Sequence, residues 1–311
     1  MTPTSTIEPF LDLLQCPVSG EPLTLRGATL VSASGAHTYD INELGVPLFA
    51  RHSSNDDARI QEAHYDRVAR AYLENLSYPH TVEYMKYWDR VLLDELRPPL
   101  DTVAELCCGA GEASWLVRDR VARAMGIDIS TAMLARARGR FPADRFGFAQ
   151  GDATQLPLRS GAFDAVFMLG GIHHVNNRSA LFSEVARILK PGGRFYFREP
   201  LDDFFLWRLA RAVVYRVSPA LDEDTERPLR RQPTIAELRS AGLNVATWTS
   251  MGFVGSCFLM NSDVLVFNRL FRLIPGIRGL TRFMAGLDEA CLLLPGLRNA
   301  GVAVTGVAVK P

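Results

Sequence analysis

The sequence has no long hydrophobic run, few cysteines and no excess of charge of either sign. No stretch of about 18 apolar residues is present, so we expect no membrane-spanning helix. The first ten residues hold neither a basic nor a long apolar segment, so no signal peptide is predicted. The five cysteines are odd in number and mostly scattered, which favours a reducing compartment over a disulfide framework. We therefore predict a cytoplasmic protein.

The charge balance also restricts the partners. The 34 basic and 34 acidic residues cancel, and without a basic field nucleic acid is not favoured as a partner. Hydrophobic residues make up 48% and charged residues 22% of the 311 positions, which is ordinary for a globular protein. This length suits one large domain, or a domain with additions.

Residues 1–52 form a small unit of their own. Short alternating segments after CPVSG (residues 16–20) predict two or three short strands. The layout resembles a zinc ribbon, in which paired Cys-x-x-Cys knuckles flank such strands. Here Ser19 stands where the second cysteine is expected, and Cys16 with His37 cannot supply four zinc ligands. We predict no metal, and a relic that packs against the rest of the protein or recognises something.

Strands and helices alternate in the middle of the chain. After a helical region over 60–96, strands are predicted near 102–106, 123–128, 145–149, 163–169 and 193–198. Helices are predicted near 112–121, 131–139 and 179–189, and a glycine pair at 192–193 is expected to end the last of them. This alternation predicts an α/β fold with a doubly wound, mostly parallel sheet covered on both faces.

The most informative segment is VAELCCGAGE, residues 103–112. It predicts a buried strand that ends near Glu105 and turns through closely spaced glycines into a helix. Glycine lets the backbone approach a ligand closely. The segment also approximates the G-x-G-x-x-G/A turn of dinucleotide-binding folds, and such a match is weak alone. The turn is therefore compatible with a nicotinamide cofactor or with S-adenosylmethionine.

The following strand ends add carboxylates and histidines. Asp128 ends the second strand and can accept hydrogen bonds from ribose hydroxyls in either cofactor class. Asp152, in GDATQLP (residues 151–157), can accept one from an adenine amine. The fourth strand runs into His173 and His174, and the fifth follows LKPGG at 189–193.

Together these motifs resemble a known family. The E-L-x-C-G-x-G turn, the acidic end of the second strand, G-D-A-x-x-L-P, F-D and L-K-P-G-G occur here in the order found in class I S-adenosylmethionine-dependent methyltransferases. The resemblance covers about residues 60–200 and is to the type that includes ubiquinone and menaquinone biosynthesis enzymes. It implies a seven-stranded sheet, S-adenosylmethionine as cofactor and S-adenosylhomocysteine as product.

The resemblance also implies the residues of the cofactor site. These are Tyr72, Glu105, Cys107, Gly109, Gly111, Asp128, Ile129, Met133, Asp152, Ala153, Leu169 and Gly170. Among their implied roles, Asp128 binds the ribose, Ile129 and Met133 pack on the adenine, and Glu105 orients the turn. Cys107 departs from the family pattern, which usually has its first glycine there.

Three residues are candidates for catalysis. Methyl transfer is an in-line displacement, so the enzyme mainly positions donor and acceptor. An oxygen acceptor benefits from a base that titrates near neutral pH, which points to His173 or His174. Glu199, just after the fifth strand, is expected to point into the same crevice.

The C-terminal part, residues 201–311, adds helices and closes the sheet. Helices are predicted over 204–215 and 234–243, strands over 244–250 and 301–309, and a helical insertion over 252–298. The insertion is rich in leucine and aromatic residues with interspersed arginines. It is expected to form a cap, and an apolar acceptor pocket or a membrane-surface patch for a lipid-like substrate is the sharper alternative.

We therefore predict three parts: the unit at 1–52, a cofactor-binding core at 53–200 and a cap with closing strands at 201–311. The predicted activity is S-adenosylmethionine-dependent methylation of a small, fairly apolar molecule, with O-methylation favoured over C- or N-methylation. The alternatives are an RNA methyltransferase, suggested by the ribbon-like start, and a fold that binds the cofactor without transferring methyl. The sequence indicates neither the acceptor nor the oligomeric state.

Overall fold

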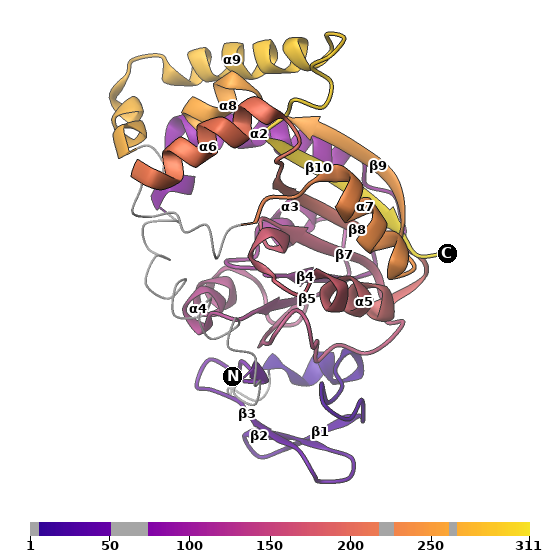
Figure 1. Ribbon diagram of the computed structural model, residues 1–311. Helices are drawn as coiled ribbons and strands as arrows, with labels where there is room; N and C mark the ends of the chain where they lie inside the picture. The colour runs from indigo at the N-terminus through magenta and orange to yellow at the C-terminus, as the bar shows by residue number, and fades with distance from the viewer. Residues whose placement is uncertain (1–5, 51–73, 218–226, 261–265) are drawn as a thin grey trace.

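The computed structural model describes residues 6–50, 74–217, 227–260 and 266–311 (Figure 1). Over these residues the centre of the molecule is a seven-stranded sheet with the order β6-β5-β4-β7-β8-β10-β9. The strands are β4 (Thr102–Leu106), β5 (Arg123–Asp128), β6 (Phe146–Gln150), β7 (Phe163–Leu169), β8 (Leu189–Pro200), β9 (Asn244–Met251) and β10 (Ala303–Val309). Neighbours from β6 to β8 are parallel, and β10 runs antiparallel to β8 and β9. The predicted doubly wound, mostly parallel sheet is confirmed.

Helices cover both faces of this sheet, and further helices gather at one end of the molecule (Figure 1). The α-helices are α2 (Pro79–Asp94), α3 (Glu112–Val117), α4 (Thr131–Arg140), α5 (Arg178–Ile188), α6 (Phe205–Val217), α7 (Arg231–Ser240), α8 (Val254–Leu259) and α9 (Ile277–Leu292). The 3-10 helices are η2 (Glu8–Leu13), η4 (Ile172–His174) and η5 (Val266–Leu273).

The buried strands separate two hydrophobic clusters because successive side chains point to opposite faces. On β4, Val103 joins the cluster that includes α3 and α4, while Ala104 joins the cluster that includes α5 and α7. Both faces of the sheet are therefore buried, which explains why these strands appear in the sequence as continuous apolar runs.

The turn between α5 and β8 differs from the prediction. The helix ends at Ile188, and Leu189 is already extended with ψ 140°. Pro191 follows and disfavours a helical conformation in the residue before it. Gly192 and Gly193 lie within β8, where the Gly192 N–H donates to the Lys310 carbonyl at 2.8 Å. The glycine pair therefore does not end the helix.

The N-terminal unit contains a three-stranded antiparallel sheet of β1 (Leu23–Arg26), β2 (Thr29–Ser32) and β3 (Thr38–Asp40). It also covers the edge of the large sheet, where the Phe49 N–H donates to the Gln150 carbonyl at 3.0 Å and the Gln150 N–H donates to the Pro47 carbonyl at 2.9 Å. Phe10 belongs to the same buried cluster as the large sheet. The unit is thus packed into the main core.

Cys16 sits in a hydrogen-bonded setting inside this unit. Its sulfur lies 3.1 Å from the Tyr39 hydroxyl and accepts the Ser19 N–H at 3.4 Å. The Ser19 hydroxyl donates to Glu21. Over the described ranges, no three His, Cys, Asp or Glu side chains are gathered to hold a metal ion.

A buried carboxylate joins the helices at the end of the molecule opposite the N-terminal unit (Figure 1). Asp288 of α9 accepts the hydroxyl of Tyr84 from α2 at 2.5 Å. It also accepts the backbone N–H groups of Phe253, Gly255 and Ser256 at the start of α8, each at 2.8 Å. These bonds satisfy donors that a helix start leaves open, so one side chain fixes α2, α8 and α9 together. We call α2, α6, α8, η5 and α9 the helical cap.

Candidate functional site

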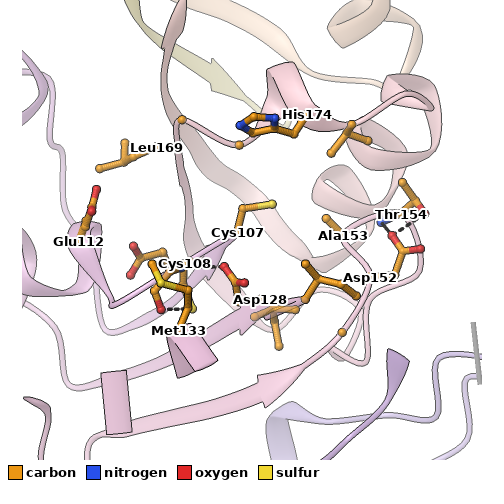
Figure 2. Close-up of a pocket in the computed structure, with 18 of the residues that line it drawn as sticks. Cys107, Cys108, Glu112, Asp128, Met133, Asp152, Ala153, Thr154, Leu169 and His174 are labelled. Atoms are coloured by element: carbon orange, nitrogen blue, oxygen red, sulfur yellow. Dashed lines mark hydrogen bonds between the residues drawn. The ribbon is translucent and has the colours of Figure 1, made fainter. Parts of the chain in front are cut away.

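A pocket lies at the carboxyl ends of β4, β5 and β7, where the strand order reverses (Figure 2). It encloses about 1050 Å³ of space, part of which is open solvent at its mouth. Most of the predicted cofactor residues line it. They are Glu105, Cys107, Gly109, Asp128, Ile129, Met133, Asp152, Ala153, Leu169 and Gly170.

The other two predicted cofactor residues are placed differently. Tyr72 lies outside the described residues. Gly111 does not line the pocket but stands at the start of α3 with φ 81°, and a side chain there would come within 2.5 Å of the Phe141 ring. The need for glycine at this position therefore comes from packing and backbone conformation.

Glu105 holds the glycine turn against the sheet. It is 2% exposed, and its carboxylate accepts the N–H groups of Ala113 and Ser114 at 2.8 Å each. Burial raises the pKa of Glu105 to about 7, and the hydrogen bonds from Ser114 and Ala113 oppose that shift. The side chain thus ties the end of β4 to the first turn of α3.

Cys107 has the left-handed backbone that glycine usually adopts. Its φ is 49°, and no other non-glycine residue in the described ranges has a positive φ. A Cβ built on Gly171 would lie 2.7 Å from the Cys107 Cβ, so the missing side chain at 171 makes room for the thiol. Burial raises the pKa of Cys107 above its ordinary value. The thiol is therefore neutral and fills space in the pocket wall.

Asp128 connects the two segments that flank the pocket floor (Figure 2). One of its oxygens accepts the Gly109 N–H at 2.7 Å, and the other accepts the Ser130 N–H at 2.9 Å. Ser130 caps α4, because its hydroxyl accepts the Met133 N–H at 3.2 Å. Asp128 thus orders both the glycine turn and the segment that leads into α4.

The segment after β6 forms another wall of the pocket. Asp152, Ala153 and Thr154 all line the cavity. One oxygen of Asp152 accepts the backbone N–H of Thr154 at 2.8 Å and its hydroxyl at 2.7 Å. This local turn fixes the direction of the Asp152 carboxylate.

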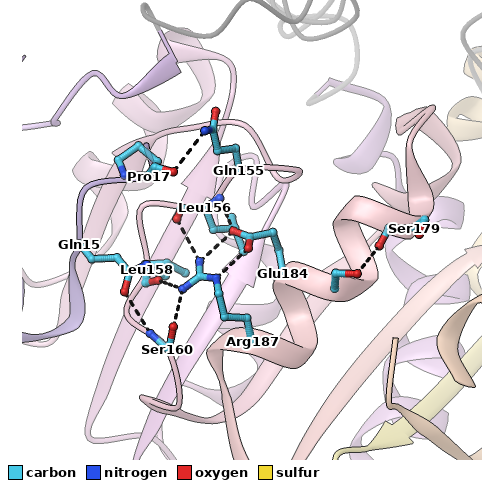
Figure 3. Close-up of polar contacts among 10 residues, drawn as sticks. Gln15, Pro17, Gln155, Leu156, Leu158, Ser160, Ser179, Glu184 and Arg187 are labelled. Carbon is cyan, nitrogen blue, oxygen red and sulfur yellow. Dashed lines mark hydrogen bonds and ion pairs between the residues drawn. The ribbon is translucent and has the colours of Figure 1, made fainter. Parts of the chain in front are cut away.

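Residues 155–160 continue that wall and are held from two sides (Figure 3). On one side, the Arg187 guanidinium donates to the carbonyls of Leu156 at 3.1 Å and Leu158 at 2.7 Å. Glu184 accepts both the Arg187 guanidinium and the Leu156 N–H. On the other side, the Gln15 N–H of the N-terminal unit donates to the Pro157 carbonyl at 2.9 Å.

The histidine pair separates into one residue in the pocket wall and one behind it. His174 lines the pocket, and its ring centroid lies 3.8 Å from that of His173. His173 Nδ1 lies 2.7 Å from Glu199 Oε2. The Glu199 side chain is buried and also accepts the N–H groups of Gly171 and Ile172 at 2.8 Å each.

The position of Glu199 differs from the expectation that it points into the crevice. Among the described residues it is not part of the pocket lining, and its carboxylate is turned toward the backbone of η4. The reason is that buried N–H groups at the start of η4 need an acceptor. Glu199 therefore holds η4 and His173 in place.

Several lining residues were missed by the sequence reasoning. They are Cys108, Glu112, Ile127, Gly151, Thr154, Gly171, Val175, Asn176 and Asn177. Most of these residues directly adjoin a predicted motif, so they could have been predicted from their position next to it. Asn176 and Asn177 carry no family signal, and only their position after the histidine pair indicates the pocket. All charged lining residues in the described chain are acidic: Glu105, Glu112, Asp128 and Asp152.

Comparison with known proteins agrees with this geometry. Residues 104–197 match a family described as a methyltransferase domain. A demethylmenaquinone methyltransferase of Beutenbergia cavernae is 32% identical over 183 residues, which is 54% of this chain and 74% of that protein. An O-methyltransferase of Pyrenophora dematioidea is 33% identical over 119 residues, covering 36% of this chain and 45% of that protein.

Among solved structures, a Thermotoga maritima protein described as an S-adenosylmethionine-dependent methyltransferase, possibly a histamine N-methyltransferase, has a TM-score of 0.55. It is 18% identical and the match covers 80% of this chain and 99% of that one. The strand order, the glycine turn and these matches define an enzyme with a methyltransferase-type α/β fold. The chain belongs to the class I S-adenosylmethionine-dependent methyltransferases, and S-adenosylmethionine is its cofactor.

The pocket residues fit this cofactor. Its sulfonium and amino groups are positive, and the pocket walls carry carboxylates. Gly170 lines the pocket with φ 74°, and a Cβ there would point into open space, so a ligand can approach the backbone closely. Asp128 would hold the ribose, and Met133 would pack on the adenine. These individual roles stay predictions.

Proposed function

We propose that the protein transfers methyl to an oxygen of a small, fairly apolar molecule, with His174 as the general base. Relatives named for a quinone and for O-methylation support this class of acceptor. The observation that carries the proposal is the position of His174 in the wall of the pocket, which is also lined by the apolar side chains of Leu169 and Val175. An imidazole there can accept a proton near neutral pH.

The chain's own groups then have separate tasks. Bound S-adenosylmethionine supplies an electrophilic methyl on a positively charged sulfur. Asp128 and the glycine turn orient the donor so that the methyl faces the acceptor. His174 takes the proton of the acceptor hydroxyl as the carbon–oxygen bond forms and the carbon–sulfur bond breaks, and it later releases that proton to water.

His173 and Glu199 are positioning residues in this proposal. The buried Glu199 accepts two backbone N–H groups of η4 and binds His173 Nδ1. The ring of His173 in turn packs against that of His174, with the two ring planes tilted by 41°. This arrangement restricts the ring of His174 to one wall of the pocket, so that its nitrogen keeps a constant direction toward the acceptor.

The acceptor can be identified with labelled S-adenosylmethionine. The full-length protein is incubated with an extract of its source cells, and mass spectrometry identifies the molecule that gains the methyl. A phenol, quinol or lipid-like hydroxyl compound is expected. A methylated RNA, or tight S-adenosylhomocysteine binding with no methylated product from fractionated extract, would overturn the proposal.

The role of His174 is tested by His174→Ala with the identified acceptor. We expect kcat to fall by about 100-fold or more, as for loss of a general base, while calorimetry finds S-adenosylhomocysteine affinity unchanged. Wild-type kcat should also fall as acid protonates the imidazole. His37→Ala, which alters a histidine of the N-terminal unit, serves as the control. Full activity of His174→Ala would leave positioning alone as the mechanism.

A further inference from the structure

Large apolar side chains are exposed mainly on the helical cap. Exposed fractions reach 62% at Leu209 on α6, 49% at Phe258 on α8 and 66% at Phe283 on α9. Outside residues 205–294, the large hydrophobic side chains exposed in the described chain are Val18, Leu44, Val82 and Trp115. Scattered exposed residues need no explanation, whereas a concentration of them marks an interaction surface.

Helix α9 shows this most clearly because it has two apolar faces. Ile277, Ala285 and Leu292 are buried at helical spacing and pack inside the protein. Leu280 and Phe283 form a second stripe with Leu287, at 48%, 66% and 44% exposure. The inner stripe packs the helix against the protein, whereas the outer stripe is largely exposed.

Helices α6 and α8 lie at the same end of the molecule as α9 (Figure 1). Phe253, at the start of α8, packs against Phe204 and Trp207 beside and within α6. Asp288 of α9 caps α8. We define the outer cap surface as Leu209, Phe258, Leu280, Phe283 and Leu287 with the helices that carry them.

The charges near this surface are mainly positive. Residues 205–212 and 266–298 contain seven arginines and no lysine, and their acids are Asp288 and Glu289. The whole chain has a net charge of +0. Arg272 pairs with Glu74 at 3.4 Å and Arg282 with Glu83 at 3.6 Å, while Arg208 and Arg269 are exposed.

This combination fits one kind of partner. A symmetric contact between two copies would place arginine-rich surfaces against each other, which costs free energy. An anionic bilayer instead offers phosphates to the arginines and an apolar interior to the side chains. No helix of the described residues is long and apolar enough to cross a membrane, so such contact would be peripheral.

We propose that the outer cap surface docks the protein onto anionic lipid bilayers, with the apolar side chains at the boundary between headgroups and acyl chains. The docking is independent of which molecule accepts the methyl group. It can therefore be tested without knowledge of the substrate, and failure of the proposed O-methylation would not affect it.

The test is flotation of the full-length protein with two kinds of vesicle. One contains phosphatidylcholine alone, and the other contains about one third phosphatidylglycerol. We expect the wild type to float with the anionic vesicles, and added salt to weaken the binding. The double variant Phe283→Asp/Leu287→Asp should reduce the partition coefficient by at least about tenfold, because burial of each side chain is lost.

The matched control is Val18→Asp/Leu44→Asp, which places the same charges on exposed apolar positions of the N-terminal unit and should float like the wild type. Because all four positions are exposed, thermal unfolding should show that both variants fold normally, and Leu280→Asp gives a second variant on the same stripe. Wild-type binding by the α9 variants would overturn the proposal. Absence of wild-type flotation would also overturn it. This includes the case in which light scattering finds a dimer of the wild type that is dissociated in Phe283→Asp/Leu287→Asp.

Discussion

At the scale of single residues, Cys107 and Gly171 form a complementary pair. Cys107 carries a left-handed backbone that ordinarily requires glycine, and its side chain fits because Gly171 has none. The family pattern places glycine at position 107. The substitution seen here is therefore tolerated through a neighbour distant in the sequence.

A double mutant tests this pairing. Gly171→Ala places a methyl group 2.7 Å from the Cys107 Cβ and should lower the free energy of unfolding by about 1–3 kcal/mol. Adding Cys107→Gly removes the clash and should restore part of this loss, as measured by urea unfolding. If Cys107→Gly changed the stability of the wild type and of Gly171→Ala by the same amount, the two sites would not interact.

Asp128 is the residue on which the cofactor site depends most. Asp128→Ala removes the acceptor of the Gly109 and Ser130 N–H groups together with the predicted ribose ligand. We expect calorimetry to detect no S-adenosylhomocysteine binding at concentrations that saturate the wild type. Asp12→Ala, which removes a partner of the exposed Arg123, should bind normally. Unchanged affinity of Asp128→Ala would remove the ribose assignment.

At the scale of elements, α2 contains a buried histidine with a pH-dependent effect on stability. His80 is fully buried beside the rings of Tyr78 and Phe271, and neither ring nitrogen has a hydrogen-bond partner among the described residues. Burial lowers the pKa of His80 from its ordinary 6.5. The unfolded chain then binds the proton more tightly than the folded protein, so stability is full above about pH 6.5 and is lost as the pH falls below it.

The direction of this pH dependence can be tested by measurement of protein stability at different pH values. Lowering the pH from about 7 to 5 should reduce the free energy of unfolding of the wild type relative to that of His80→Leu, because Glu105, whose raised pKa gives the opposite slope, is present in both proteins. His37→Leu serves as the control because it also removes one histidine but lies in the N-terminal unit. An identical pH slope in His80→Leu and the wild type would show that the acid sensitivity comes from other groups.

The bracing of the loop at 155–160 by α5 depends on Arg187. Its guanidinium is shared between Glu184 and the carbonyls of Leu156 and Leu158 (Figure 3). Arg187→Ala should lower the free energy of unfolding by about 2–3 kcal/mol, since it removes charge-assisted hydrogen bonds. Arg187→Lys should recover little, because an ammonium lacks the planar fork.

Urea unfolding measures both variants, and Arg123→Ala provides the comparison. Arg123 also bonds a carboxylate, but its pair with Asp12 is exposed, so a loss below about 1 kcal/mol is expected. If Arg187→Ala behaved like Arg123→Ala, the bonds from α5 would contribute little to holding this wall of the pocket.

At the scale of the whole molecule, local patterns predicted the sheet and the strand-end residues. β4, β5 and β7 match their predicted bounds because each is an apolar run that ends in turn residues. Burial on both faces and the position of strand ends follow from local sequence. The family resemblance then placed the cofactor residues at those ends.

Long-range contacts were not predictable in this way. Strand position alone did not show that Glu199 turns away from the crevice, because this depends on the N–H groups of a loop from another part of the chain. The sequence did not predict the role of Asp288 either, since Tyr84, which donates its hydroxyl to Asp288, lies far away in the sequence. The N-terminal unit was predicted to pack or to recognise something, but the sequence did not indicate that Phe10 would join the main hydrophobic cluster of the core.

The attachment of the N-terminal unit to β6 has a consequence for solubility. An uncovered edge strand offers its backbone to strands of other molecules and promotes aggregation. Here residues 47–49 pair with Gln150 at the end of β6. Because they belong to the same chain, their local concentration at this end of the edge does not depend on the protein concentration. The N-terminal unit can thus protect this end of the sheet against self-association without any metal.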